Sequence, residues 1–432
     1  MKIGIIGGGF TGLSCALELL KSGHHVTVFE KEKNPGGLAI GFKEKNWKWT
    51  LEEHYHHLFT NDKIALRLAR EIGVSVIVNR PKTSTLINNS IYQLDSPLSL
   101  IKFPLLSQIE RLRMGFAIAM LKYNPFWQVF DKKSIHLTLP KMMGERAYEM
   151  IWKPLLMGKF GDYISKISMA WFWARIKKRT SSLAYPEGGY LEFAKKLTEK
   201  IEKLNGKFSF STEILEIKTN KNNPYLCYHD LNHDNKKASL AYFDKIIVTI
   251  PSPLFIKITP GLPSDYKEKI KDLKFLAATN LLLRFKKPFL SDGTYWLNIC
   301  EPGSKLMAVV EHTNFMDKKY YDNEHLVYVG HYIPQEHKYF TMVKEDFLNI
   351  IDPYLQKLNK DYKENLIDAR FFKTAYAQPI ITPGYAQKIP SLKTPIENIY
   401  LANMSQIYPW DRGVNYAIEL GIKAAKTISK GV

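Results

Sequence analysis

Lys2-Ile-Gly-Ile-Ile-Gly-Gly-Gly-Phe-Thr-Gly-Leu13, followed a short helix later by Val26-Thr-Val-Phe-Glu30, decides the fold of this 432-residue chain. The order predicts a strand, a glycine turn, a helix and a second strand that ends in an acidic residue. Gly7, Gly9 and Gly12 have the G-x-G-x-x-G spacing. In that motif the first glycine allows a tight turn, the second lets the backbone approach a pyrophosphate, and the third lets helix and strand pack closely. The stretch therefore predicts a dinucleotide-binding turn.

The residues after the glycines fit a phosphate site at a helix N-terminus. Ser14–Lys21 is helix-like, and Gly23 ends the helix in the manner of a C-cap. The start of such a helix offers unbonded N–H groups and a positive dipole end to phosphates. Glu30 lies 18 residues after Gly12, where a carboxylate can accept hydrogen bonds from a ribose hydroxyl. An acid at this position favours FAD or NAD over NADP.

A second glycine pair distinguishes between FAD and NAD. Lys31-Glu-Lys-Asn-Pro-Gly-Gly-Leu-Ala39 places Gly36 and Gly37 shortly after the acid. The pair resembles the Gly-Gly motif of the two-dinucleotide-binding-domain flavoproteins, with Leu38 where that motif often has Arg. The chain is thus similar to the flavin superfamily of amine oxidases, protoporphyrinogen oxidases, carotenoid desaturases and UDP-galactopyranose mutases. The resemblance implies an α/β fold in which a Rossmann-like FAD domain is interleaved with an α+β substrate domain.

Three more regions resemble the same superfamily. They are Pro186–Leu191, the pair Thr212–Ile217 and Phe243–Pro253, and the closing stretches Asn398–Met404 and Gly413–Gly421. The resemblance implies a set of FAD-binding residues: Gly7, Gly9, Phe10, Thr11, Gly12, Glu30, Lys31, Gly36, Gly37, Leu38, Ile214, Asn403, Val414 and Asn415. Because Ala402-Asn-Met404 contains no Cys in the flavin turn, the FAD is expected to be non-covalent.

The domains are expected to alternate along the chain. The FAD domain is predicted to comprise residues 1–80, 186–250 and 391–432, and the substrate domain residues 81–185 and 251–390. The first substrate segment is helical by its apolar periodicity, and the second contains short β-like runs bounded by turn residues.

Composition limits the partners. The net charge is +19, but only 11 of the 61 basic residues are Arg, the residue expected for specific phosphate recognition. No basic run is interleaved with aromatic residues in the manner of a single-strand-binding groove, so nucleic-acid binding is not expected. Contact with an acidic membrane surface, or with an anionic substrate, remains as a hypothesis. Three well-separated Cys residues and the lack of a membrane-length apolar run favour a cytoplasmic location.

Two polar clusters are candidates for chemistry beside a flavin. Glu52-Glu53-His54-Tyr55-His56-His57 follows an expected hairpin and would pass the flavin ring in the superfamily. Tyr408-Pro-Trp-Asp-Arg-Gly-Val-Asn415 precedes the last helix, whose N-terminus would face the flavin pyrimidine. His56, His57 and Arg412 are the predicted catalytic residues. No second ligand group has metal spacing, so no metal site is expected.

Two other regions are weaker candidates for lining the substrate site, one as a tunnel and the other as the wall opposite the flavin. Trp152–Asp162 and Trp171–Arg175 alternate aromatic and basic residues, which suits either a tunnel lining or a helical core. Glu311–Asn314 ends a predicted strand and is the candidate for the opposite wall.

The residues disfavour amine oxidation and rank three other functions. Asn280 falls where amine oxidases carry a Lys, and Gly413 where they carry an aromatic, so amine oxidation is disfavoured. The prediction is an FAD-dependent oxidoreductase that oxidises or desaturates the carbon skeleton of a small molecule. The alternative is a sugar mutase that uses reduced flavin without net oxidation, resembling UDP-galactopyranose mutase. A non-catalytic flavin-binding protein ranks lowest.

Overall fold

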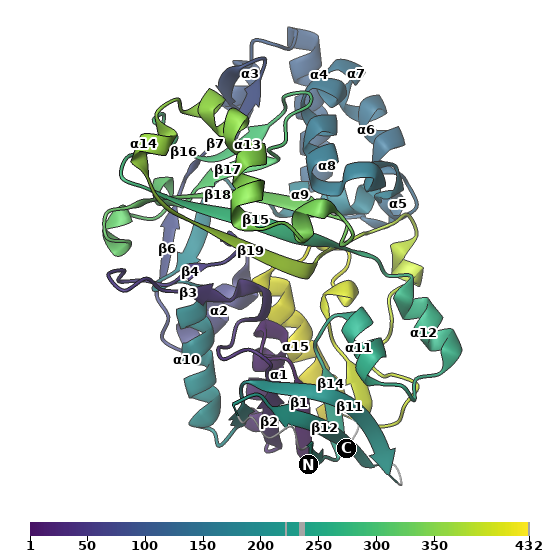
Figure 1. Cartoon of the computed structure of the whole chain (residues 1–432). Coiled ribbons are helices and arrows are strands. Elements are labelled where there is room, and N and C mark those ends of the chain that lie inside the picture. The colour runs from purple at the N-terminus through teal and green to yellow at the C-terminus, as the bar shows by residue number, and fades with distance from the viewer. Residues whose placement is uncertain (221–222, 233–237, 431–432) are drawn as a thin grey trace.

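A parallel five-stranded sheet forms one end of the computed structural model, which describes residues 1–220, 223–232 and 238–430 (Figure 1). The strand order is β10 (Lys207–Ser209), β2 (His25–Phe29), β1 (Lys2–Ile6), β14 (Lys245–Val248) and β20 (Ile399–Leu401). The carboxyl ends of parallel strands meet at one edge, which is where open α/β sheets bind their ligands. The predicted Rossmann-like sheet is therefore present.

Three helices cover this sheet: α1 (Phe10–Lys21), α10 (Tyr190–Glu202) and α15 (Val414–Ser429). The helices α1 and α15 touch almost backbone to backbone. A Cβ on Gly421 would lie 2.1 Å from Ser14 Oγ, and Ser14 Oγ itself donates to the carbonyl oxygen of Phe10. The last helix is thus locked against the helix that follows the glycine turn.

An antiparallel sheet and two short helices lie beside the parallel sheet. The sheet consists of β11 (Thr212–Asn220), β12 (Asn223–Asp230) and β13 (Ser239–Tyr242). The helices α11 (Ser252–Ile258) and α12 (Ser264–Lys271) share a hydrophobic core with β14 and β20. The predicted boundary at residue 250 assigns both helices to the substrate domain, whereas their apolar side chains pack against the FAD-domain sheet.

A seven-stranded sheet forms the middle of the molecule. Its order is β19 (Leu366–Pro379), β15 (Phe275–Phe285), β18 (His325–Ile333), β17 (Ala308–Glu311), β16 (Thr294–Ile299), β7 (Lys82–Ile87) and β8 (Ser90–Gln93). Only β7 and β16 pair in parallel. The helix α13 (Lys344–Leu358) packs Phe347, Ile351 and Leu355 onto this sheet.

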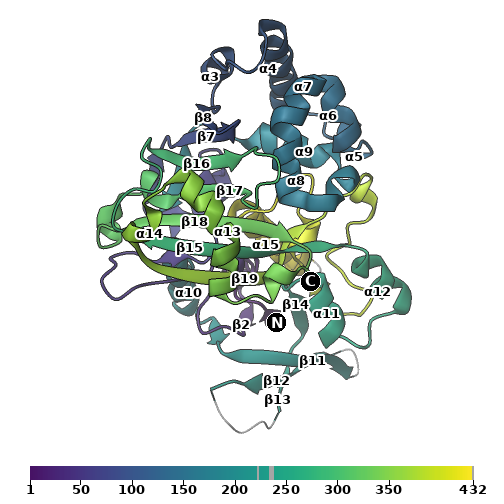
Figure 2. The ribbon, with the colours of Figure 1, turned by 45° about the horizontal axis from the view of Figure 1, so that its top comes forward.

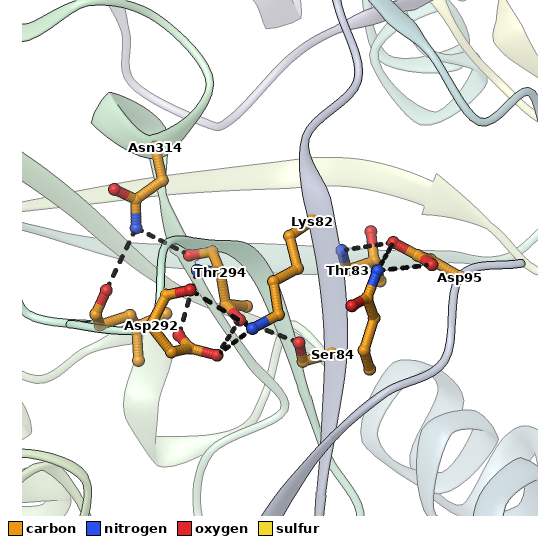
Figure 3. A network of polar contacts seen from close by, with 9 residues as sticks. Lys82, Thr83, Ser84, Asp95, Asp292, Thr294 and Asn314 are labelled. Atoms are coloured by element: carbon orange, nitrogen blue, oxygen red, sulfur yellow. Dashed lines mark hydrogen bonds and ion pairs between the residues drawn. The ribbon is translucent and has the colours of Figure 1, made fainter. Parts of the chain in front are cut away.

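A polar network joins the two sequence segments of this sheet (Figure 3). Lys82 Nζ lies 2.6 Å from Asp292 Oδ2, and the buried hydroxyls of Ser84 and Thr294 are 2.9 Å apart. Asn314 Nδ2 donates to the carbonyl oxygen of Thr294. Because buried polar groups require partners, these bonds fix how β7 meets β16, across more than two hundred residues of sequence.

Helices cap the remaining side of the molecule. They are α3 (Pro97–Ile101), α4 (Gln108–Tyr123), α5 (Gln128–Asp131), α6 (Ile135–Met143), α7 (Glu145–Ala147), α8 (Lys153–Phe160) and α9 (Met169–Lys178), with a π-helical turn at Tyr148–Trp152. They enclose one core that includes Tyr148, Phe160 and Trp173. The structure thus has the predicted helical first segment of the substrate domain.

The remaining elements are short. Two small sheets are present: one pairs β3 (Gly41–Phe42) with β4 (Leu51–Glu52), and the other pairs β9 (Leu183–Pro186) with β5 (Leu58–Phe59) and β6 (Val76–Asn79). The helices α2 (Lys63–Glu71) and α14 (Tyr362–Asn365) complete the set, with 3-10 turns at Gly37–Ala39, Gly161–Lys166, His312–Asn314, Lys318–Tyr320, Lys338–Phe340, Tyr385–Gln387 and Met404–Gln406.

Candidate functional site

The turn between β1 and α1 has no room for side chains at two glycines. Gly7 has a φ of +108°, and a Cβ there would lie 2.5 Å from Thr249 Oγ1. A Cβ on Gly12 would lie 2.0 Å from the carbonyl oxygen of Gly7. The first N–H groups of α1 have no carbonyl of their own helix to donate to, so they are available to a pyrophosphate. The turn has the shape that a dinucleotide requires.

The side chains at the start of α1 face the protein rather than this turn. The ring of Phe10 packs against Tyr190 and Phe193, with centroids 6.4 and 5.1 Å away. Thr11 is also buried. These two predicted cofactor residues can therefore offer a ligand little besides backbone N–H groups.

Glu30 stands beside the turn, at the end of β2. Its Oε2 accepts the Gly8 N–H at 2.6 Å and its Oε1 accepts the Glu32 N–H at 2.9 Å. Burial raises the pKa of the Glu30 carboxyl, although these backbone donors oppose the rise. Each oxygen keeps a lone pair for a ribose hydroxyl. The neighbouring Lys31 instead forms a surface ion pair of 2.7 Å with Glu213.

The second glycine pair packs directly on the first glycine turn. The N–H of Gly36 donates to the carbonyl oxygen of Gly8 at 3.0 Å. A Cβ on Gly37 would lie 3.0 Å from Gly9 Cα, at a φ of +58°. The two glycine stretches that sequence reasoning singled out are therefore in backbone contact. Leu38 is half-buried in the turn that follows.

Two predicted cofactor residues near the C-terminus use their side chains inside the fold. Asn415 Oδ1 caps α2 by accepting the N–H groups of Ile64 and Ala65 at 3.1 and 3.0 Å. Asn403 is buried; its Oδ1 accepts the Ser405 N–H, and its Nδ2 donates to the carbonyl oxygen of Ile250. A flavin would thus meet mainly backbone here, at the free N–H groups of the α15 N-terminus.

Val414 is buried at the first position of α15, next to Asn415. Ile214 is half-buried at a bulge in β11 and packs against the core of the parallel sheet. Val414 thus lies on the last helix, and Ile214 lies on a strand next to the parallel sheet; both stay predicted cofactor residues.

The two acids of the candidate loop differ in environment. Glu52 is buried, and its carboxylate accepts the Tyr185 hydroxyl at 2.8 Å and the Tyr190 N–H at 2.7 Å. Burial raises the pKa of Glu52 to about 7 in spite of these donors. Glu53 offers its carbonyl oxygen to Asn280 Nδ2 at 2.5 Å. Glu52 therefore anchors the loop within the protein, while Asn280 holds its far side.

The three histidines are half-buried. His56 Nδ1 is 2.6 Å from the carbonyl oxygen of His54, and His57 Nδ1 is 3.2 Å from the Tyr295 hydroxyl. Burial lowers the pKa of His54 and His57 to about 3 and that of His56 to about 4, so all three rings are neutral at physiological pH. His54 Nε2 is buried without a hydrogen-bond partner among the described residues. His54, which the predicted catalytic set leaves out, therefore has the ring nitrogen that is free to act.

The acid before the last helix pairs with a partner from another part of the sequence. Asp411 Oδ2 lies 2.8 Å from Arg175 Nη1, and Asp411 Oδ1 accepts the indole N–H of Trp171 at 3.0 Å. Burial opposes ionisation, but Lys159, Arg175 and Arg412 together hold the pKa of Asp411 below its usual range. Although Arg412 is the next residue in the chain, the side chain of Asp411 pairs with that of Arg175.

Arg412 is directed toward the seven-stranded sheet. Its Nε donates to Gln378 Oε1 at 3.1 Å, and its Nη2 donates to the hydroxyl of Tyr332. Its charge also contributes to the lowered pKa of His54 and His56. The predicted catalytic residues from both ends of the chain thus lie near one another.

Lys159 completes a group of three cations. Its Nζ lies 4.6 Å from the centroid of the Tyr332 ring and 5.4 Å from that of Trp171. Within the described ranges no carboxylate lies within ion-pair distance of Lys159. Burial lowers the pKa of Lys159 well below its usual range, and Arg175 and Arg412 add to this while Asp411 opposes it. Lys159, Arg175 and Arg412 are called the cationic cluster below.

Other candidates have internal roles or find no support. Glu311 accepts the Leu290 N–H at 2.6 Å, and His312 lies 2.9 Å from the Tyr321 hydroxyl, so both are occupied within the core. In the part of the chain that the structure describes, no group of three His, Cys, Asp or Glu could hold a metal ion. No helix there is long and apolar enough to cross a membrane.

Comparison with known proteins identifies the family. Residues 10–429 match the model of flavin-containing amine oxidoreductases. The 15-cis-phytoene desaturase of Synechococcus elongatus is 22% identical over 93% of this chain and 90% of its own length. Two solved structures share the fold: a protein from Exiguobacterium sp. 255-15 assigned as a protoporphyrinogen oxidase (TM-score 0.75, 16% identity, covering 100% of this chain and 99% of that one) and reduced UDP-galactopyranose mutase (TM-score 0.76, 16% identity, 100% and 96%).

The chain belongs to the flavin-containing amine oxidoreductase family and is an FAD-dependent oxidoreductase. The glycine turn, Glu30 and the α15 N-terminus suit that cofactor. The predicted fold, cofactor and enzyme class are thereby confirmed.

Proposed function

We propose that this enzyme oxidises the carbon skeleton of a small molecule that carries an anionic group. The cationic cluster supports this proposal, because three cations share the single carboxylate of Asp411 and Lys159 has no acidic partner within ion-pair distance among the described residues. Lys159 is half-buried, and a partly desolvated cation without a counter-charge is costly, so a ligand anion is the natural partner. A protonated amine would meet repulsion at the same place. Amine oxidation therefore remains disfavoured, as Asn280 and Gly413 already suggested.

The residues divide the task by position. Bound FAD supplies the electron acceptor. Arg412, oriented by Gln378 and Tyr332, and Lys159 would hold the anionic group. Asp411 keeps Arg175 and the Trp171 indole in place. Burial keeps the rings of His54 and His56 uncharged at neutral pH, so they can accept a hydrogen bond from a ligand but are weak bases.

Anion binding is expected to raise the pKa of Lys159. Burial lowers that pKa and the charge of an arriving anion opposes the effect, so any protons exchanged at the amine on binding would be taken up. The uptake can be measured by calorimetry in buffers of different ionisation enthalpy.

The test compares ligands that differ only in charge. Phenylacetate and phenylacetamide are titrated into the FAD-loaded enzyme, and the visible flavin spectrum reports binding. We expect phenylacetate to bind at least about tenfold more tightly, and Lys159→Met to remove that preference. Lys153→Met, on the same helix but exposed and paired with Glu149, is the matched control. Equal binding of acid and amide to the wild type would refute the proposal.

A reduced-flavin sugar mutase is the second candidate, because the cationic cluster also suits the diphosphate of a nucleotide sugar. Oxidised and dithionite-reduced enzyme should be compared with nucleotide sugars and with carboxylated, oxidisable compounds. Isomerisation of a sugar only by reduced enzyme, with no electron transfer to any acceptor, would favour the mutase.

A further inference from the structure

The helix α4 has apolar side chains on two opposite faces. Met114, Ala117 and Leu121 point into the core of the helical cap. Ile109, Leu112, Phe116 and Tyr123 are each more than 70% exposed. Their spacing of three, four and seven residues places all four on one stripe of the helix, away from the buried face. An outward stripe of this kind is not explained by the packing of the chain.

Four more exposed apolar side chains flank α4 in the sequence. They are Leu98 and Ile101 on α3, Phe126 before α5 and Val129 on α5. These eight residues account for eight of the nineteen exposed large apolar side chains among the described residues, within a stretch of 32. They are called the apical surface below. In both views α3 and α4 form the end of the molecule opposite the β11–β13 sheet (Figures 1 and 2).

Basic residues outnumber acidic residues in the segment that carries the apical surface. Residues 97–146 contain eight Lys or Arg and three Asp or Glu. Of the acids, Asp131 is buried and accepts the Tyr408 hydroxyl, so it contributes little at the surface. Lys102, Lys132, Lys133 and Lys141 are all exposed. An apolar stripe accompanied by basic residues is the pattern of segments that lie in the interface of a bilayer with acidic lipids.

We propose that the apical surface docks on a membrane containing anionic lipids, with α4 in the plane of the interface. At 16 residues α4 is about 24 Å long, which suits lying on a bilayer rather than crossing it. A second copy of the chain is a poorer occupant, because contact between two such surfaces would bring two basic segments together. The surface lies beside the candidate site: Trp173 of α9 donates its indole N–H to Asn124, and α9 also carries Trp171 and Arg175.

The test uses the full-length, FAD-loaded protein and vesicles. Co-sedimentation is measured with phosphatidylcholine vesicles and with vesicles containing one part in four phosphatidylglycerol, at about 0.1 M salt. We expect at least about tenfold more binding to the anionic vesicles, and the double variant Leu112→Ser/Phe116→Ser to lose at least about tenfold of it. The matched control is Leu240→Ser/Val343→Ser, which removes exposed apolar side chains elsewhere.

Flavin absorption and far-UV circular dichroism verify that each variant is folded. Failure of the wild type to bind anionic vesicles, or unchanged binding by the apical double variant, overturns the proposal. Light scattering provides the other refutation: a dimer that the apical double variant converts to monomer, without vesicle binding, would make the surface a contact between copies.

Discussion

The wild type should lose folding stability as pH rises because Glu52 ionises, and the Glu52→Gln variant should lack this loss. Glu52 is 1% exposed, and burial raises its pKa from an ordinary value near 4.5 to about 7. Between these values the folded state binds more protons than the unfolded state, so the free energy of unfolding falls as pH rises. This rise in the pKa of Glu52 corresponds to about 3 kcal/mol of folding stability, which is present at low pH and fully lost above pH 7. The glutamine variant has no such ionisation.

The free energy of unfolding is compared between the Glu52→Gln variant and the wild type, because the histidines of both proteins add a pH dependence of the opposite sign. Urea unfolding is followed at pH 4.5, 6 and 8, with free FAD at a fixed excess. Relative to the wild type, Glu52→Gln should gain about 3 kcal/mol between the lowest and the highest pH. Glu199→Gln, exposed on α10, should show no such change. A difference independent of pH would refute the account, since it would mean that Glu52 ionises normally in the folded protein.

Gly12→Ala should lose FAD on gel filtration, because its Cβ would meet the Gly7 carbonyl oxygen at 2.0 Å. Gly115→Ala is the control, because its Cβ would meet only Leu100, at 3.6 Å. This control should retain FAD and gain up to about 1 kcal/mol in folding stability. Denaturation should release all the flavin, as measured by absorbance of the filtrate, because the FAD is expected to be non-covalent. His54→Ala should slow flavin reduction more than it weakens FAD binding, and equal effects on both would return this ring to a structural role.

The Rossmann half of the fold could be predicted from short sequence patterns because each of its parts is local. Gly7 and Gly12 are required by contacts within the turn and its own helix, so their spacing alone carries the information. The same holds for the long helix near Ile109, whose buried face has helical periodicity. The pairing of β7 with β16 is different, because Lys82 and Asp292 carry no pattern that links them.

Side-chain roles in the site were harder to predict for a physical reason. Asn403 and Asn415 are predicted cofactor residues, but their amides fasten a turn and cap α2. The position of a residue in a family motif predicts which stretch of backbone approaches the cofactor. It does not indicate which polar groups of a loop lack a partner, as His54 Nε2 does among the described residues.

The cationic cluster shows why charge must be judged in space rather than along the sequence. Arg175 belongs to a basic run that the sequence explains as the end of a helix, and the run does end α9. Its guanidinium nevertheless meets Asp411, 236 residues away, and this contact leaves Lys159 and Arg412 without that carboxylate as a close partner. The surplus of positive charge in the site therefore follows from one long-range pairing. Exchanging Asp411 for Asn should increase the affinity for anions while it frees Arg175, a combination that a purely structural role of Asp411 would not produce.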